Sequence, residues 1–274
     1  MCIRDRPWNR NAAFVKLARN SRSVCVDLKH RKGREIFLEL VGHADVVIEN
    51  FSASTMSNLN LDYETLVEAN PNIIYLTMPG FGKTGPYKDW IAFGPIIEPM
   101  SGLTAAMGYS LEEPRNSGVA LVNPTSATSA AAAIVTAIRS RKKKVGGSTH
   151  IEMSLHEAGV SFNGPWLIDS QLGAPSPVLN NGHPNMCPHG VYPCKGEDEW
   201  LALACEDQKD WETLAKIDHS LDTSWTIKER QECADSINLS IAAWCETRTK
   251  ESAAEQLQNM GIAAGPVNTV PDMF

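Results

Sequence analysis

Two histidines and two cysteines gather in one short stretch of the sequence, namely His183, Cys187, His189 and Cys194. Imidazole nitrogen and thiolate sulfur are the ligands that structural zinc prefers, but their spacing here matches no standard zinc finger. Prolines also interrupt the stretch. We therefore predict a loop near a substrate channel and no metal site.

A second segment that could do chemistry runs from Gly80 to Thr84, with the sequence GFGKT. A phosphate-cradling P-loop needs a glycine five residues before Gly82, a position that Thr77 holds here. It also needs a helix directly after the Lys-Thr pair, where Gly85 and Pro86 stand instead. The segment is predicted to be a loop, and nucleotide hydrolysis is not expected.

A basic run and a set of tryptophans are assigned to structure rather than to ligand binding. The basic run, Arg139, Arg141, Lys142, Lys143 and Lys144, ends a long predicted helix, where positive charge complements the helix dipole. We interpret it as a solvated helix end and not as a phosphate or RNA site. Four tryptophans are predicted to lie in the core of a second domain: Trp200, Trp211, Trp225 and Trp244.

The elements that must position any site alternate between strands and helices in the first part of the chain. Apolar runs and helical periodicity predict strands over 23–28, 45–49 and 73–78, and helices over 32–41 and 62–69, the latter capped by Asp62. This alternation favours an α/β fold with a parallel sheet. A Gly- and Pro-rich loop is predicted over 79–99, a strand over 150–154 and a helix over 155–172. Between them lies an alanine-rich helix over 124–141, with Asn123 as its N-cap and Pro124 in its first turn.

The composition changes at Gly173, and the pattern after it differs. A hairpin is predicted from 191–194 and 200–204 around residues 196–199. Helices are predicted over 208–217, 227–246 and 250–260, and an extended piece over 262–267. We predict two domains: a Rossmann-like sheet domain over 1–180, lacking an N-terminal unit, and a smaller α+β domain over 181–274, lacking a C-terminal return.

The bulk composition excludes several classes of protein. The 274 residues carry 25 basic and 32 acidic side chains, a net charge of −7, which gives no support to nucleic-acid binding. No apolar run is long enough to span a bilayer, and no secretory signal is present at the start. Seven scattered cysteines without a CxxC pair are typical of reduced thiols, which indicates a cytoplasmic protein.

Several segments, in order, resemble the family III CoA-transferases of the CaiB/BaiF type, the group that contains formyl-CoA transferase, carnitine CoA-transferase and α-methylacyl-CoA racemase. The segments are NSRSVCVDLK at 20–29, ADVVIENF at 44–51, GFGKTGPY at 80–87, GSTHIEMS at 147–154 and GIAAGPVN at 261–268. Each one alone is weak, whereas their combination over nearly the whole chain is specific. The resemblance implies transfer of coenzyme A between an acyl-CoA and a small carboxylic acid, with no permanently bound cofactor and with CoA as a substrate.

The resemblance places Asn123, in the segment SGVALVNPTS at 117–126, where the family keeps its nucleophilic aspartate. A carboxylate attacks a thioester, whereas a neutral carboxamide hardly does. Asparagine caps a helix about as well as aspartate, so the fold can persist without the nucleophile. Four interpretations stay open: reduced or absent activity, an erroneous codon, a non-catalytic relative that binds CoA esters or pairs with an active paralogue, and replacement by another carboxylate. The available carboxylates are Asp27, Glu98 and Asp169.

The family's CoA contacts, carried over by resemblance, fall on three short segments: Val26, Asp27, Leu28 and Lys29; Asn50, Phe51 and Ser52; and Ile91, Ala92 and Phe93. A family arginine that pairs with phosphate aligns with Asn58, which lacks the charge. The racemase branch uses a histidine near Phe93 together with the aspartate, and both are absent, so the transferase branch is the better match.

The resemblance also predicts that the chain is a piece of a longer protein. Family members carry a strand–helix unit before Asn20 and continue past Val270, and two protomers interlock as a homodimer. Without the returning segment, we expect this stretch alone to be poorly stable.

Overall fold

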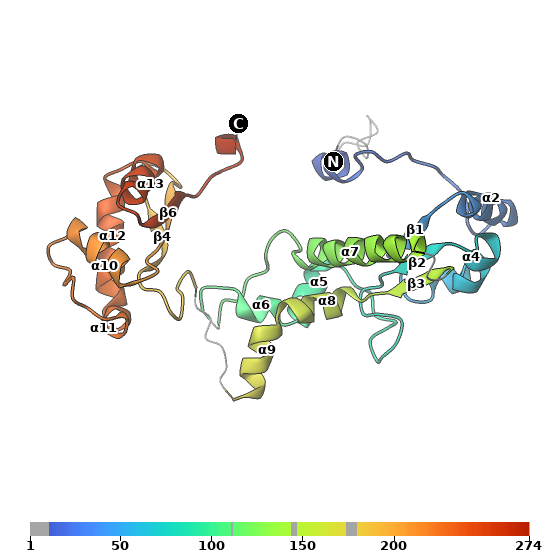
Figure 1. Cartoon of the computed structure of the whole chain (residues 1–274), viewed down its shortest axis with the longest axis horizontal. Helices are drawn as coiled ribbons and strands as arrows, with labels where there is room; N and C mark the ends of the chain where they lie inside the picture. The colour runs from blue at the N-terminus through green and yellow to red at the C-terminus, as the bar shows by residue number, and fades with distance from the viewer. Residues whose placement is uncertain (1–10, 111, 144–146, 174–179, 274) are drawn as a thin grey trace. The chain divides into compact units, whose positions relative to one another are not determined.

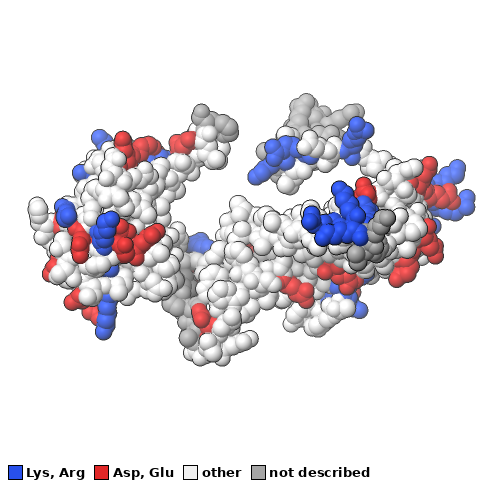
Figure 2. All heavy atoms as spheres, in the orientation of Figure 1, with Lys and Arg blue, Asp and Glu red and all other residues white. Residues whose placement is uncertain are grey.

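The structure is a computed structural model that describes residues 11–110, 112–143, 147–173 and 180–273 (Figure 1; Figure 2 shows the same orientation with all heavy atoms as spheres). The Cα positions divide the chain into two compact units, residues 1–97 with 121–162 and residues 98–120 with 163–274. The domain boundary near residue 180 stays a prediction.

A three-stranded parallel sheet organises the first unit (Figure 1). Its order is β1 (Val46–Glu49), β2 (Ile74–Thr77) and β3 (Thr149–Glu152). Their carboxyl ends are in register, since Glu49 pairs with Thr77 and Thr77 with Glu152. The central strand β2 is buried along its whole length, which its apolar sequence predicts. The predicted α/β fold with a parallel sheet is confirmed.

Helices pack against this sheet through apolar stripes. Helices α2 (Arg31–Gly42) and α4 (Tyr63–Ala69) enclose a small core with β2, and α7 (Val122–Lys142) packs against β2, β3 and α8 (Leu155–Phe162). Asp62 caps α4 as predicted, because its carboxylate accepts bonds from the Thr65 amide at 3.1 Å and hydroxyl at 2.7 Å. These bonds lower the pKa of Asp62. The shorter helices are α1 (Ala12–Leu17) and α3 (Thr55–Asn58).

Four predicted elements differ from the structure. Residues 23–28 form no strand, since they pair with no other strand and Val24 is exposed. The predicted 79–99 loop ends early, because α5 spans Gly94–Met100. The predicted 155–172 helix is broken at Asn163 into α8 and α9 (Gly164–Gln171), and the buried Asn163 donates to the Ser101 carbonyl at 2.9 Å. The predicted 227–246 helix is broken at Cys233 into α11 (Ile227–Glu232) and α12 (Ala234–Glu246).

The second unit contains an antiparallel sheet in the order β4 (His189–Pro193), β5 (Trp200–Ala204) and β6 (Ala263–Pro266). The predicted hairpin and final extended piece are therefore confirmed. The helices of this unit are α6 (Leu103–Ala106), α9, α10 (Gln208–Leu214), α11, α12 and α13 (Lys250–Asn259), with 3-10 turns at Ala215–Ile217 and Pro271–Met273.

The core of this unit lies between its sheet and helices. Trp211 is fully buried, and Trp225 and Trp244 are packed against the same core, as predicted. The prediction for Trp200 is wrong: its side chain is 38% exposed, because it lies on the face of β5 that alternates away from the buried Leu201 and Leu203. The sequence predicts the strand but does not say which of its faces is covered.

Four of the cysteines of this unit are buried thiols, and a further one, Cys233, is partly buried. Cys187, Cys194, Cys205 and Cys245 are buried and free, whereas Cys25 in the first unit is exposed. Burial raises the pKa of Cys205 and of Cys245 to about 12. Such thiols hold little thiolate at neutral pH and are chemically inert.

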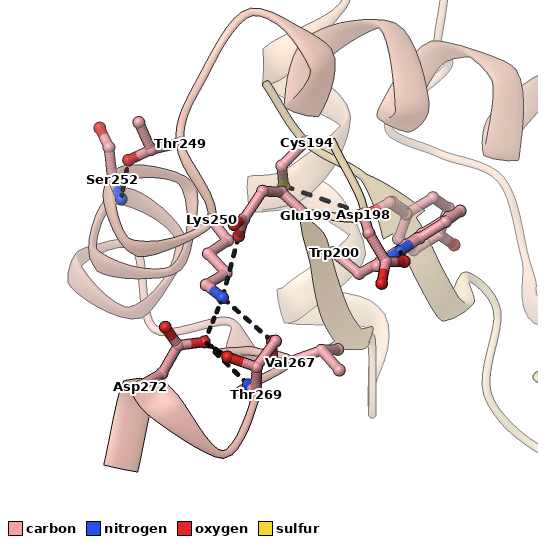
Figure 3. Close-up of polar contacts among 11 residues, drawn as sticks. Cys194, Asp198, Glu199, Trp200, Thr249, Lys250, Ser252, Val267, Thr269 and Asp272 are labelled. Atoms are coloured by element: carbon pink, nitrogen blue, oxygen red, sulfur yellow. Dashed lines mark hydrogen bonds and ion pairs between the residues drawn. The ribbon is translucent and has the colours of Figure 1, made fainter. Parts of the chain in front are cut away.

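A buried lysine fastens the last described segment to the second unit (Figure 3). Lys250 is 2% exposed, and its ammonium lies 2.9 Å from the Glu199 carboxylate and 2.6 Å from that of Asp272. The Thr269 amide and hydroxyl also donate to Asp272, at 2.8 Å and 2.9 Å. The bonds from Lys250 and Thr269 lower the pKa of Asp272 to about 2, and the two carboxylates raise the pKa of Lys250.

Asp272→Asn should remove an acid-dependent part of the stability. The pKa of Asp272 falls from 3.8 to about 2 on folding, so its contribution is complete above about pH 4 and disappears as the pH falls through 2. In melting experiments from pH 5 to pH 2, the natural chain should have a higher melting temperature than the variant at pH 5 and the same melting temperature near pH 2. Glu255→Gln, at an exposed position on α13, is the control and should show no such convergence. A constant difference across this range would contradict the prediction.

Candidate functional site

The carboxyl edge of the parallel sheet carries a pocket of about 290 Å³. The chain leaves β1 at Asn50, leaves β2 toward Gly80 and leaves β3 toward Leu155. Residues from all three exits and from the following loop line the pocket: Asn50, Phe51, Ser52, Pro79, Gly80, Lys88, Asp89, Trp90, Ile91, Ala92 and Leu155. Open parallel sheets bind ligands at this edge.

The end of β1 is held in place by a buried carboxylate. Glu49 accepts bonds from the Phe51 amide at 2.7 Å, from the Tyr75 hydroxyl at 3.2 Å and from the Thr77 hydroxyl. Asn50 donates its side-chain amide to the Met78 carbonyl. Burial and then the Glu49 carboxylate raise the pKa of Tyr75, which keeps the phenol neutral. The backbone at Phe51 is therefore fixed, while the Phe51 ring is left half exposed at the pocket.

The opposite wall depends on one glycine. A Cβ atom at Gly80 would lie 2.0 Å from the Cβ of Ala92, so only glycine lets residues 88–92 close over the strand ends. The predicted loop at 80–84 is confirmed, since after β2 no helix begins until α5 starts at Gly94.

The structure brings together part of the predicted CoA-contact set. Asn50, Phe51, Ser52, Ile91 and Ala92 line this one pocket. Phe93 is 67% exposed and does not line it.

The segment Val26, Asp27, Leu28 and Lys29 also lies outside the pocket, in the turn before α2. The Asp27 carboxylate accepts the Lys29 amide at 2.9 Å, and Arg34 donates to the Lys29 carbonyl at 3.0 Å. Gly33 packs so closely on this turn that a Cβ there would lie 1.9 Å from the Asp27 carbonyl oxygen.

Asn123 is exposed and is the second residue of α7. The predicted N-cap role of Asn123 is wrong, because the helix begins at Val122 and Leu121 is the N-cap. The backbone turns sharply just before this, with Ala120 in the left-handed region at φ 49°. Residues of the first helical turn have amides without intrahelical partners, and this partial positive charge favours an anion. A carboxylate at position 123 would therefore be kept ionised.

A second pocket, of about 430 Å³, lies beside the first turns of α7. It is lined by Thr125, Ser129, Glu152, Met153, Ser154, Glu157, Ala158, Ser161 and Phe162. Asn123 precedes these residues in the chain and is not part of the lining.

Two of the carboxylates weighed as replacements for the nucleophile are engaged elsewhere. Glu98 is 1% exposed, and the Ser117 amide and hydroxyl both donate to it. Asp27 holds the turn before α2. A nucleophile must present a lone pair to the substrate, so neither arrangement suits attack on a thioester.

The histidine–cysteine stretch has other partners. His189 contacts the Asn181 carbonyl at 2.6 Å, and the Cys187 thiol donates to the Arg230 carbonyl at 3.3 Å. Over the described residues, no three His, Cys, Asp or Glu side chains converge as a metal ion would require. The described helices also include none of the length and apolarity needed to cross a membrane.

Sequence reasoning missed Lys88, Asp89, Trp90 and Glu49. Lys88, Asp89 and Trp90 lie in the Gly- and Pro-rich segment 79–99, which is predicted only to be a loop. The run Tyr-Lys-Asp-Trp at 87–90 nevertheless combines rings and charges. Glu49 has a clearer signal, because a carboxylate that ends an apolar strand and precedes Asn-Phe must find bonding partners when buried.

Comparisons with known proteins place these features in context. The sequence model of CoA-transferase family III matches residues 4–274. A succinyl-CoA–D-citramalate CoA-transferase of Chloroflexus aurantiacus is 28% identical, with 99% of this chain and 68% of the relative aligned. A succinate–glutarate CoA-transferase of Agrobacterium fabrum is 31% identical, with 97% and 68% aligned.

A probable CoA-transferase of Mycobacterium tuberculosis, Rv1866, is 26% identical over 96% of this chain but only 34% of its own length. The chain thus spans between a third and about two thirds of these relatives. Among solved structures, a CaiB/BaiF family protein from Brucella suis aligns with a TM-score of 0.83 and 28% identity, covering 93% of this chain and 68% of that one.

Proposed function

The chain belongs to CoA-transferase family III, and we propose from this that it binds acyl-CoA at the carboxyl edge of its parallel sheet and serves transfer of CoA to a carboxylic acid. The observation that supports this most directly is the pocket in which Asn50, Phe51, Ser52, Ile91 and Ala92 meet, although they come from two segments far apart in the sequence. Relatives named for succinyl-CoA, glutarate and oxalate support small carboxylic acids as the partners of the reaction.

The proposed chemistry needs a carboxylate at position 123. Its oxygen attacks the thioester carbonyl carbon, the C–S bond breaks and the electron pair leaves with the CoA thiolate, giving a mixed anhydride. The thiolate then attacks the carbonyl of the enzyme's side chain, which releases the acyl group as a carboxylate and leaves an enzyme–CoA thioester. An incoming carboxylate reverses these steps. Asn123 offers a neutral amide for the first step, so we propose that the natural chain binds acyl-CoA and transfers CoA slowly or not at all.

The substitution at Asn123 also favours a second candidate, a non-catalytic relative that binds CoA esters or pairs with an active paralogue. The relatives include proteins named as the alpha and the beta subunit of a succinyl-CoA–L-malate CoA-transferase, 29% and 27% identical to this chain. In that case activity would require the paired subunit. Homodimerisation and a cytoplasmic location remain predictions.

Calorimetric titration of the natural chain with CoA and with succinyl-CoA tests the binding proposal. We expect a dissociation constant between about 1 μM and 1 mM, the range of ordinary enzyme substrates. Asn50→Ala should weaken CoA binding, because it removes the bond to the Met78 carbonyl that fixes the end of β1 beside the pocket. Asn238→Ala, at a pocket of the second unit, is the matched control and should leave binding unchanged. Absence of binding at millimolar ligand would refute the proposal.

A further inference from the structure

Trp90 is a half-exposed aromatic side chain that is held in place in the lining of the pocket at the carboxyl edge of the parallel sheet. Trp90 is 52% exposed, yet its ring packs against two others. The ring centroids lie 4.3 Å apart for Trp90 and Tyr87, and 6.0 Å apart for Trp90 and the buried Phe81, which meet edge-on. Phe81 in turn packs against the His156 ring, with 5.6 Å between the ring centroids. An exposed indole is normally free to change rotamer, whereas this one is supported from behind by other rings. It offers a fixed flat surface to a ligand.

Two opposite charges directly precede Trp90 in the sequence and line the same pocket. Lys88 and Asp89 both line the pocket, and within the described part of the chain neither is within ion-pair distance of an opposite charge. The other lysine of this region, Lys83, is paired with Glu152 at 3.6 Å. Lys88 therefore keeps its charge available for a ligand anion, while Asp89 opposes the approach of an anion.

The size of the pocket selects one end of the ligand. At about 290 Å³ it is at the lower limit of ordinary ligand sites, so it takes only part of a molecule as long as CoA. The pantetheine arm has no aromatic ring and no charge, whereas the nucleotide end has a purine and phosphates. A supported indole with an unpaired ammonium matches the nucleotide end.

Resting on the proposed binding of CoA, we propose that Trp90 stacks on the adenine ring and Lys88 pairs with a phosphate of the same nucleotide. The side chains of residues 88–90 then read the nucleotide half of CoA, and Asp89 weakens that recognition. This assigns specificity to residues outside the segments that the family resemblance supplies.

Titrations with CoA, ADP and pantetheine test this assignment. Trp90→Ala should weaken binding of CoA and of ADP by about tenfold, the value of one base–aromatic stack, and leave pantetheine unchanged. Trp90→Phe should restore most of the loss. Lys88→Ala should weaken the binding of CoA and ADP several-fold and reduce the dependence of their affinity on salt concentration. Asp89→Asn should tighten the binding of both ligands.

The controls are Trp200→Ala and Lys228→Ala, which remove an exposed ring and an exposed charge from the second unit and should change nothing. Circular dichroism confirms that each variant is folded. If the natural chain binds CoA, but the Trp90→Ala variant binds CoA and ADP as tightly as the natural chain does, the inference is overturned and the proposed function stands. Equal weakening of pantetheine would also overturn it, since Trp90 would then only shape the pocket. If the natural chain binds no CoA, the proposed function fails and the inference with it.

Discussion

Replacing Asn123 with aspartate should raise the rate of CoA exchange by about a thousandfold or more. Removal of a catalytic nucleophile typically costs enzymes factors of this size or larger, so restoring one should recover it. The position supports the new charge, because it lies in the first turn of α7, at the positive end of the helix dipole, and the side chain is exposed. The exchange of label between succinyl-CoA and free carboxylic acids measures the rate. Mass spectrometry should also detect CoA bound to residue 123 through a thioester that hydroxylamine cleaves.

Two variants separate the nucleophile from a mere change of charge. Thr128→Asp adds the same charge at an exposed position of the same helix, and Asn123→Ala removes the amide. Neither should increase exchange. If the natural chain turns over well and Asn123→Asp gains nothing, position 123 is not the seat of the nucleophile. If neither turns over although both bind CoA, the second candidate, a partner of an active subunit, is supported.

Gly80→Ala should abolish most CoA binding and destabilise the first unit. The added methyl would lie 2.0 Å from the Cβ of Ala92, which is impossible, so residues 88–92 must move away from the strand ends. Overpacking of this kind costs about 1–3 kcal/mol. The move also separates Trp90 and Ala92 from Asn50 and Phe51, so we expect CoA affinity to fall at least about tenfold. Thermal unfolding and CoA titration measure the two effects.

A compensating substitution tests whether the clash with Ala92 causes these losses. Ala92→Gly removes the methyl that clashes, so the double variant Gly80→Ala with Ala92→Gly should recover most of the binding and stability. Gly164→Ala is the control, because a Cβ there meets no atom within 4 Å, and within α9 it should be neutral or stabilising. A Gly80→Ala variant that binds and melts like the natural chain would show that the close approach is not required.

The strands of the parallel sheet were predictable because burial on both faces leaves a continuous apolar run. Residues 45–49 and 73–78 have this pattern, and both form strands. The pattern at 23–28 alternates instead, and the strand predicted from it does not form, because a strand needs a hydrogen-bonding neighbour and alternation within one segment does not reveal one. The Asp62 cap was predictable because it is a local interaction within three residues.

The breaks and the site depended on contacts between distant residues. Asn163 interrupts a helical pattern because it bonds to Ser101, which no local periodicity encodes. The start of α7 at Val122 follows from the left-handed turn at Ala120, a conformation that alanine rarely adopts. Likewise, the wall that carries Trp90 forms only through the approach of Gly80 to Ala92, and the resemblance pointed to the neighbouring residues instead.

The uneven distribution of thiol burial has a practical consequence. Among the described cysteines, Cys25 is the exposed one, and it directly precedes the Val26–Lys29 turn, whereas the cysteines buried in the second unit are shielded and have raised pKa values. Maleimide reagents react with accessible thiolates, so among the cysteines that the structure describes a fluorophore would attach preferentially at Cys25. Within the described part of the chain, Cys25 thus offers an attachment point for an optical reporter beside a segment predicted to contact coenzyme A.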